Sequence, residues 1–177
     1  MNRVARCGGA LLVTVLVAPG LAQAPGLSGT WKLDASRSRI GAATLAGLIK
    51  AGPPDVLYIT HAANGTLIIE SRMNESQSRI YTPGSRTTTP VVPGGTITMI
   101  SRWEGRTLVS EGRQESASGT VASVKEVLAL DPDGQVLTID VTTTGPDDKG
   151  ASTLIYTRTT LVEPCEKWPT PCKQTGR

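Results

Sequence analysis

The sequence contains no phenylalanine, and its 177 residues include only three tryptophans and three tyrosines. A hydrophobic core in this chain must therefore be built mainly from Leu, Ile, Val and the methyl groups of Thr. β-Branched side chains suit the pleated surface of a sheet better than the crowded surface of a helix. The shortage of aromatic residues thus favours a β protein, and it leaves few large side chains to fill a wide interior.

Histidine is equally scarce, which argues against most catalytic and metal sites. His61 is the only histidine, and it lies beside an expected hairpin end, where a surface position is the default. A catalytic triad needs a base that is held by an acid and touches a nucleophile, and no spacing in this sequence meets that requirement. The sequence also has no His/Cys cluster, phosphate-binding loop or dinucleotide fingerprint. We therefore expect no enzyme activity, no catalytic residue, no metal and no cofactor.

The chain lacks a strong charge of either sign once its first residues are set aside. Its formal net charge is +3 at neutral pH, and removing Arg3 and Arg6 leaves +1. A nearly neutral domain has no electrostatic basis for binding nucleic acid or an acidic membrane. We expect neither partner, and the sequence does not indicate a protein partner.

No apolar run is long enough to span a bilayer, but a short one lies near the start of the chain. Arg3 and Arg6 precede an apolar segment from Ala10 to Ala18, and small residues follow at alternate positions up to Ala24. This order is typical of a secretory signal peptide. We expect cleavage after Ala24, or alternatively after Ala22, and a periplasmic or extracellular protein with no stable membrane anchor. An uncleaved anchor is the competing interpretation, and it requires a longer apolar run.

Short links join segments of alternating apolar and polar residues through most of the chain. Asn64-Gly65, Glu104-Gly105 and residues 131–134 have the composition of tight turns between paired strands. Such links in an all-β chain predict an antiparallel meander, and closing it into a barrel removes its exposed edges. We predict an all-β, antiparallel up-and-down β-barrel of about 8–10 strands, which follows the signal peptide (1–24) and spans residues 25–162. The expected strands are Thr30–Ala35, Val56–Ala62, Thr66–Met73, Gln77–Thr82, Ser85–Thr89, Thr96–Trp103, Arg106–Glu115, Val121–Leu130, Gln135–Thr144 and Ser152–Thr159.

One segment between the first two strands departs from this pattern. Apolar residues recur at roughly helical spacing from Ile40 to Ile49, and Gly52-Pro53-Pro54 ends the segment. We predict one short helix over residues 40–50. Its apolar side must be buried, and the nearest apolar surface is the mouth of the barrel. Leu45, Leu48 and Ile49 are therefore tentative lid residues, and a static cap that completes the core is the alternative.

The last residues, 163–177, form a proline-rich tail that contains two cysteines. Cys7 precedes the apolar run and leaves with the signal peptide, so the mature chain keeps Cys165 and Cys172. An even number of cysteines in an exported chain predicts a disulfide bond between them. This bond would close a small loop around Trp168.

The first strand carries a motif that resembles a known superfamily. Residues 29–33, Gly-Thr-Trp-Lys-Leu, resemble the opening strand of the fatty-acid-binding proteins and fit the Gly-x-Trp signature of the lipocalins. Both families are calycin barrels. In the lipocalin pattern a late-strand arginine packs across this tryptophan, and Arg158 matches that arginine. Fatty-acid-binding proteins, which are typically cytosolic, carry an Arg-x-Tyr pair on the last strand that holds the ligand carboxylate, whereas this chain has the reversed order Tyr156-x-Arg158.

Together with the expected signal peptide, the resemblance implies an exported lipocalin-like protein that binds a small hydrophobic or amphipathic ligand inside its barrel. The tentative ligand contacts are Trp31, Tyr58, Met99, Trp103, Tyr156 and Arg158. A packed core position is the alternative for the apolar members of this set. The competing functions are a non-catalytic envelope scaffold with a filled barrel and, without an acid–base pair to support it, an enzyme.

Overall fold

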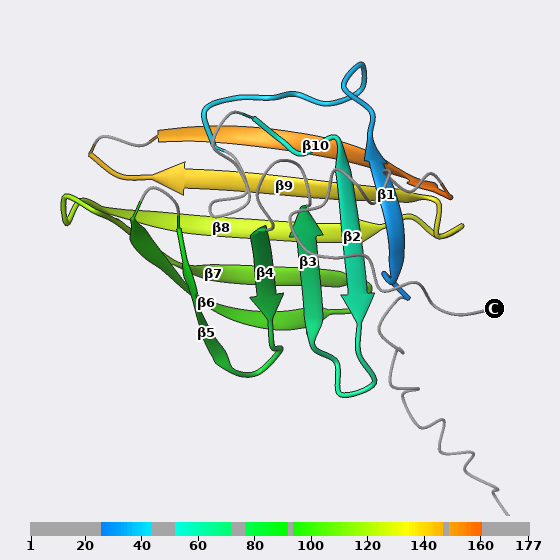
Figure 1. Cartoon of the computed structure of the whole chain (residues 1–177), viewed down its shortest axis with the longest axis horizontal. Helices are drawn as coiled ribbons and strands as arrows, with labels where there is room; N and C mark the ends of the chain where they lie inside the picture. Colours follow the sequence, from blue (N-terminus) through cyan, green and yellow to red (C-terminus); the bar gives the residue numbers. More distant parts are fainter. Residues whose placement is uncertain (1–25, 44–51, 72–76, 92–93, 147–148, 161–177) are drawn as a thin grey trace, which may run out of the picture.

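Ten antiparallel strands form one sheet that curls into a nearly closed barrel (Figure 1). The computed structural model describes residues 26–43, 52–71, 77–91, 94–146 and 149–160. Strands β1 to β4 cross the longer strands β6 to β10, as Figure 1 shows. The all-β barrel predicted from the turn pattern is therefore confirmed, at the upper limit of the predicted strand number. The strands are β1 Gly29–Leu33, β2 Val56–His61, β3 Leu67–Ser71, β4 Gln77–Tyr81, β5 Arg86–Pro90, β6 Gly95–Glu104, β7 Thr107–Ser116, β8 Val121–Leu130, β9 Val136–Thr144 and β10 Lys149–Thr159.

The first and last strands of the chain lie side by side, because β1 pairs with both β2 and β10. The two edges of the sheet are instead β4 and β5, and no ladder joins them in the described part of the chain. The turn between them bonds to β6, since the Gly84 amide donates to the Ser101 carbonyl at 2.8 Å and Pro83 forms a parallel bridge with Ser101. The short link between the expected strands Gln77–Thr82 and Ser85–Thr89 is a turn, but the two strands do not form a hydrogen-bonded hairpin.

Side chains alternate between the interior of the barrel and its outer surface, as the period of a strand requires. The interior holds a large apolar cluster in which Trp31, Leu57, Leu128 and Leu137 have no exposed surface. The remaining members come from almost every strand: Leu27, Ala43, Ile59, Leu67, Ile69, Tyr81, Leu108, Leu130, Ile139, Val141, Leu154 and Tyr156. Leucine and isoleucine dominate this cluster, as the absence of phenylalanine requires.

The helix predicted over residues 40–50 is wrong for the part that the structure describes. Arg39 forms an antiparallel bridge with Thr153 of β10, and Ile40 is half exposed. The segment is held extended because the unpaired stretch of β10 beyond β1 accepts and donates main-chain hydrogen bonds there. Ser152 continues this contact, since its hydroxyl accepts from the Gly41 amide at 2.8 Å and donates to the Ala43 carbonyl.

Several other predictions concern residues outside the described part of the chain. These are the signal peptide, the lid residues Leu45, Leu48 and Ile49, the tail, and the disulfide between Cys165 and Cys172. They stay predictions. Within the described residues, no helix has the length and apolar character needed to cross a membrane.

Candidate functional site

A layer of polar side chains crosses the interior of the barrel. Glu126 of β8 lies directly opposite Ser110 of β7, which in turn lies opposite Ser101 of β6. All three residues are buried, and the two serine hydroxyls are 2.7 Å apart. We call Ser101, Ser110 and Glu126, together with Arg79 and Tyr81 of β4, the polar layer.

Glu126 connects β8 to the edge strand β4 across the barrel. Its Oε2 atom accepts hydrogen bonds from Arg79 Nη2 and from Tyr81 Oη, each at 2.8 Å. The side chains of Arg79 and Glu126 are 2% and 0% exposed, so the ion pair is shielded from water. The guanidinium of Arg79 also lies 5.3 Å from the centre of the Tyr81 ring. The other carboxylate oxygen, Glu126 Oε1, is buried and has no hydrogen-bond partner in the described structure.

The electrostatics of this cluster favour a charged arginine and a neutral tyrosine. Burial, the largest single cause, lowers the pKa of Arg79, but the charge of Glu126, its hydrogen bond and the neighbouring Tyr81 together raise that pKa above its usual value. Burial raises the pKa of Tyr81 well above its usual value of 10.0. Tyr81 therefore keeps its proton and donates a hydrogen bond to Glu126, while Arg79 supplies one full positive charge.

The polar layer separates two apolar regions on β6, β7 and β8. On one side, Leu108, Leu128 and the half-buried Trp103 belong to the large cluster. On the other side lies a small cluster of Ile97, Met99 and Val124, with the half-buried Val91 packed against it. The strand period places Glu126 between Val124 and Leu128, so the carboxylate interrupts an otherwise apolar inner face.

The predicted contact between Arg158 and Trp31 is present. The guanidinium carbon of Arg158 lies 4.4 Å from the centre of the Trp31 ring. The arginine also donates to three main-chain carbonyls: Nε to Gly134 at 2.8 Å, Nη1 to Ser28 at 2.7 Å and Nη2 to Gly26 at 3.1 Å. Arg158 thus ties the first residues of the barrel to the β8–β9 turn, which is a structural role.

The other tentative ligand contacts occupy different environments. Trp31 and Tyr156 are buried, with Trp31 Nε1 donating to the Leu27 carbonyl at 3.0 Å and Tyr156 Oη donating to the Pro54 carbonyl at 3.0 Å. Burial raises the pKa of Tyr156 above its usual value of 10.0, so the hydroxyl keeps its proton. Tyr58 is half buried and alternates with the inward Leu57, so it lies on the outer face of β2.

Met99 and Trp103 both face inward on β6, as their alternation with Ile97 predicted. Met99 belongs to the small cluster, and Trp103 packs against the large one. His61 stacks on Trp103 with ring centres 5.6 Å apart, so the histidine packs on an aromatic ring at the end of β2. Contact of any of these residues with a ligand stays a prediction.

Sequence analysis missed the polar layer, although two signals for it exist. Alternate residues of β8 from Ala122 to Leu130 are apolar except Glu126, and a lone carboxylate on a buried face needs a partner. The Arg-x-Tyr order, which the family resemblance placed on the last strand, occurs instead at Arg79-Ile80-Tyr81 on β4. Nothing local in the sequence connects these two signals, because they lie on strands that do not pair.

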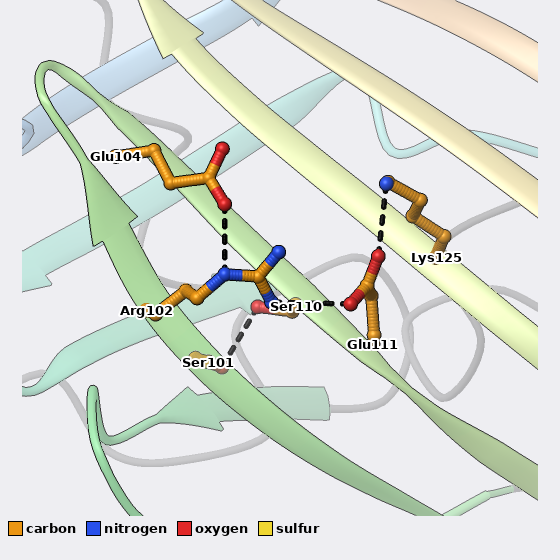
Figure 2. Close-up of polar contacts among 6 residues, drawn as sticks. All are labelled: Ser101, Arg102, Glu104, Ser110, Glu111 and Lys125. Carbon is orange, nitrogen blue, oxygen red and sulfur yellow. Dashed lines mark hydrogen bonds and ion pairs between the residues drawn. The ribbon is translucent and has the colours of Figure 1, made fainter.

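The outer surface of the same strands carries a separate charge network (Figure 2). Arg102 contacts Glu104 at 2.7 Å and Glu111 at 3.1 Å, and Lys125 contacts Glu111 at 2.8 Å. All four side chains are about half exposed, so water and salt weaken these pairs. The network connects β6, β7 and β8 on the outer surface of the barrel.

In the described residues, no three His, Cys, Asp or Glu side chains gather as they would to hold a metal ion.

The barrel has an antiparallel up-and-down topology, and solved structures of fatty-acid carriers resemble its fold. The REP1-NXSQ fatty acid transporter superposes with a TM-score of 0.53 at 15% identity, over 77% of this chain and 98% of that one. A point mutant of that transporter gives a TM-score of 0.52 at 14% identity, over 75% and 98% of the two chains. The Echinococcus granulosus fatty-acid-binding protein 1 superposes with a TM-score of 0.47 at 12% identity, over 75% of this chain and 97% of that one.

The first two likenesses confirm the calycin fold predicted from Gly29 to Leu33, and identities this low establish the fold alone. No protein-family model matches the sequence, and no curated protein sequence matches it either.

Proposed function

We propose that this chain is an exported, non-enzymatic binding protein that holds one small hydrophobic or amphipathic molecule inside its barrel. The fold supports this proposal, because a solved barrel of the same class is a fatty acid transporter. The ligand would lie on the side of the polar layer that carries the small cluster of Ile97, Met99 and Val124.

The observation that carries the proposal is the buried, incompletely satisfied carboxylate of Glu126. An ion pair inside a protein is often no more stabilising than apolar residues of the same volume. Buried polar atoms are nearly always hydrogen-bonded, so an exception calls for a reason. A role of the Glu126 carboxylate in binding a ligand would explain why one of its oxygens has no partner in the described structure.

The position of the ligand follows from how tightly the two sides are closed. The side of the polar layer that holds the large cluster, which we call the floor, is closed, and its members Trp31 and Leu137 are completely buried. Beyond the polar layer, by contrast, the inward residues Thr87, Gly112 and Gln114 are only half buried. A molecule with an apolar tail would therefore contact the small cluster and present its polar end to the polar layer.

A pair of tryptophan substitutions on β8 tests this placement. Val124→Trp adds bulk inside the small cluster, whereas Val121→Trp adds the same bulk at an exposed position of the same strand. We expect native mass spectrometry with a panel of lipids to show one-to-one complexes for the wild type and Val121→Trp, and none for Val124→Trp. Circular dichroism checks that both variants fold. Binding that survives in folded Val124→Trp contradicts the placement.

Export is supported by the sequence order of Arg3, the apolar run from Ala10 to Ala18, and Ala24. Expression of the full chain in a bacterial host, followed by mass spectrometry of the envelope fraction, tests it. We expect a mature chain that starts shortly after Ala22 or Ala24. An intact chain that stays in the cytosol contradicts export.

A scaffold with a filled barrel is the second candidate function. The complete burial of the large cluster, including Trp31 and Tyr156, favours it. The same lipid panel separates the two candidates, because a filled scaffold forms no stoichiometric complex with any member.

A further inference from the structure

Only one oxygen of the Glu126 carboxylate is used by the protein. Oε2 accepts from both Arg79 and Tyr81, whereas Oε1 is buried without a partner in the described structure. Ser110, directly opposite on β7, does not fill this position, because its hydroxyl bonds to Ser101 and makes no hydrogen bond to Oε1. An ionised carboxylate only accepts hydrogen bonds. The unused position is therefore able to accept a hydrogen bond from a donor outside the described chain.

We propose that the barrel selects a ligand whose head group donates a hydrogen bond and carries no negative charge, with Glu126 Oε1 as its acceptor. This inference rests on the proposed binding function. The chemical class is an apolar chain that ends in a hydroxyl or an amide N–H, such as a fatty alcohol or a fatty amide.

The charge balance of the polar layer excludes a carboxylate head group. Arg79 is the positive charge of the layer, and Glu126 already neutralises it at 2.8 Å. A ligand carboxylate that approached Oε1 would bring two negative charges together where water is excluded, and like charges at such sites do not both ionise readily. A neutral donor meets no such repulsion, and it satisfies the remaining acceptor.

The same two donors explain why an anionic ligand finds no anchor. Arg79 and Tyr81 form an Arg-x-Tyr pair that faces the interior, which is the kind of pair that binds a carboxylate with two hydrogen bonds. In this chain both side chains donate a hydrogen bond to the protein's own carboxylate. Glu126 therefore takes the position of an acidic head group, and it offers the ligand an acceptor in place of two donors.

The tail of the ligand has an apolar environment next to this acceptor. Val124 is the next inward residue of β8, and it packs with Ile97 and Met99 in the small cluster. Methionine is unbranched and adapts its shape to its surroundings, so Met99 is able to move aside for an alkyl chain.

A matched pair of twelve-carbon ligands tests the head-group preference in the wild-type protein. Isothermal titration calorimetry at pH 7 compares dodecanol with dodecanoate, which have equal chain lengths and differ in the head group. We expect dodecanol to bind at least tenfold more tightly. If dodecanoate binds as tightly as dodecanol, the head-group inference is overturned while the proposed function stands. If the wild type binds no member of an alcohol, amide and acid series, the proposed function itself fails.

A conservative substitution identifies Glu126 as the cause. Glu126→Gln keeps the shape of the side chain but removes its negative charge, so a ligand carboxylate no longer meets a like charge at this position. We expect the preference for dodecanol over dodecanoate to fall at least tenfold, whereas Glu115→Gln, on the outer face of β7, leaves it unchanged. A folded Glu126→Gln variant with the wild-type preference overturns the inference. The wild-type comparison decides the matter alone if this variant does not fold.

Discussion

The ion pair between Arg79 and Glu126 is the feature whose removal has the most predictable effect on stability. Glu126→Leu removes the buried ion pair of a guanidinium that is 2% exposed and leaves the Tyr81 hydroxyl without its Glu126 acceptor. Leaving one charge of a buried pair uncompensated costs about 3–5 kcal/mol. With a urea m-value of about 2 kcal/mol per molar, this loss lowers the unfolding midpoint by about 2 M.

Replacing all three side chains tests whether the stability lost in Glu126→Leu comes from breaking the buried ion pair. The triple variant Arg79→Met, Tyr81→Phe and Glu126→Leu removes every charged or hydroxyl group of the cluster together. Apolar replacement of a buried ion pair is often neutral or stabilising by about 1–4 kcal/mol, so we expect the triple variant to recover most of the lost stability.

Urea unfolding followed by circular dichroism measures both effects. Glu115→Leu is the control, because this exposed glutamate on the neighbouring strand should shift stability by less than about 0.5 kcal/mol. A loss below about 1 kcal/mol in Glu126→Leu would refute the argument that the pair ties β4 to β8 inside the barrel. A triple variant that is even less stable than Glu126→Leu would refute it as well.

Further predictions concern the floor, the strand spacing and the behaviour in acid. Arg158→Ala removes three main-chain hydrogen bonds and the contact with Trp31, and thermal unfolding should show a loss of about 2 kcal/mol, with Gly26→Ala as the neutral control. Gly112→Ala should cost about 1–3 kcal/mol, because the added methyl group would collide with the backbone of Thr98 and Met99; wild-type stability contradicts this. The Val136 amide, the first of several stabilising contacts, lowers the pKa of Asp131 from 3.8. The stabilisation is therefore full above that pH and is lost as the pH falls through the lower folded value, and Asp131→Asn should flatten the dependence of Tm on pH between 5 and 2.

The barrel was predictable because its strands are specified locally. Asn64-Gly65 and Glu104-Gly105 mark turns whose neighbours alternate with period two, and Gly65 and Gly105 adopt the positive φ that such turns require. The motif around Trp31 located the first strand, and its resemblance to the lipocalin pattern placed Arg158 against that tryptophan. The turns need only short-range pattern, whereas the Arg158 contact was predicted from the resemblance.

The polar layer was not predictable from patterns of this kind. Arg79 and Glu126 lie on strands that do not pair, so their contact depends on the curvature of the whole sheet. The helical spacing that starts at Ile40 was misleading because the free stretch of β10 captures the main chain there. Another strand has a similar effect between β4 and β5. The turn at Gly84 bonds to Ser101 of β6, and the two strands that it joins do not pair with each other.

The pairing of the first strand with the last one also sets the order of folding. Ser28 and Arg158 are joined by a hydrogen bond although they lie 130 positions apart in the chain. Contacts of such long range form slowly, because most of the chain must be ordered before they stabilise it. During synthesis, the nascent chain can form its hairpins one after another, but Trp31 has no Arg158 to pack against until β10 leaves the ribosome. The barrel therefore closes only once β10 is available to pair with β1, and a truncation before β10 should leave a chain that cannot close.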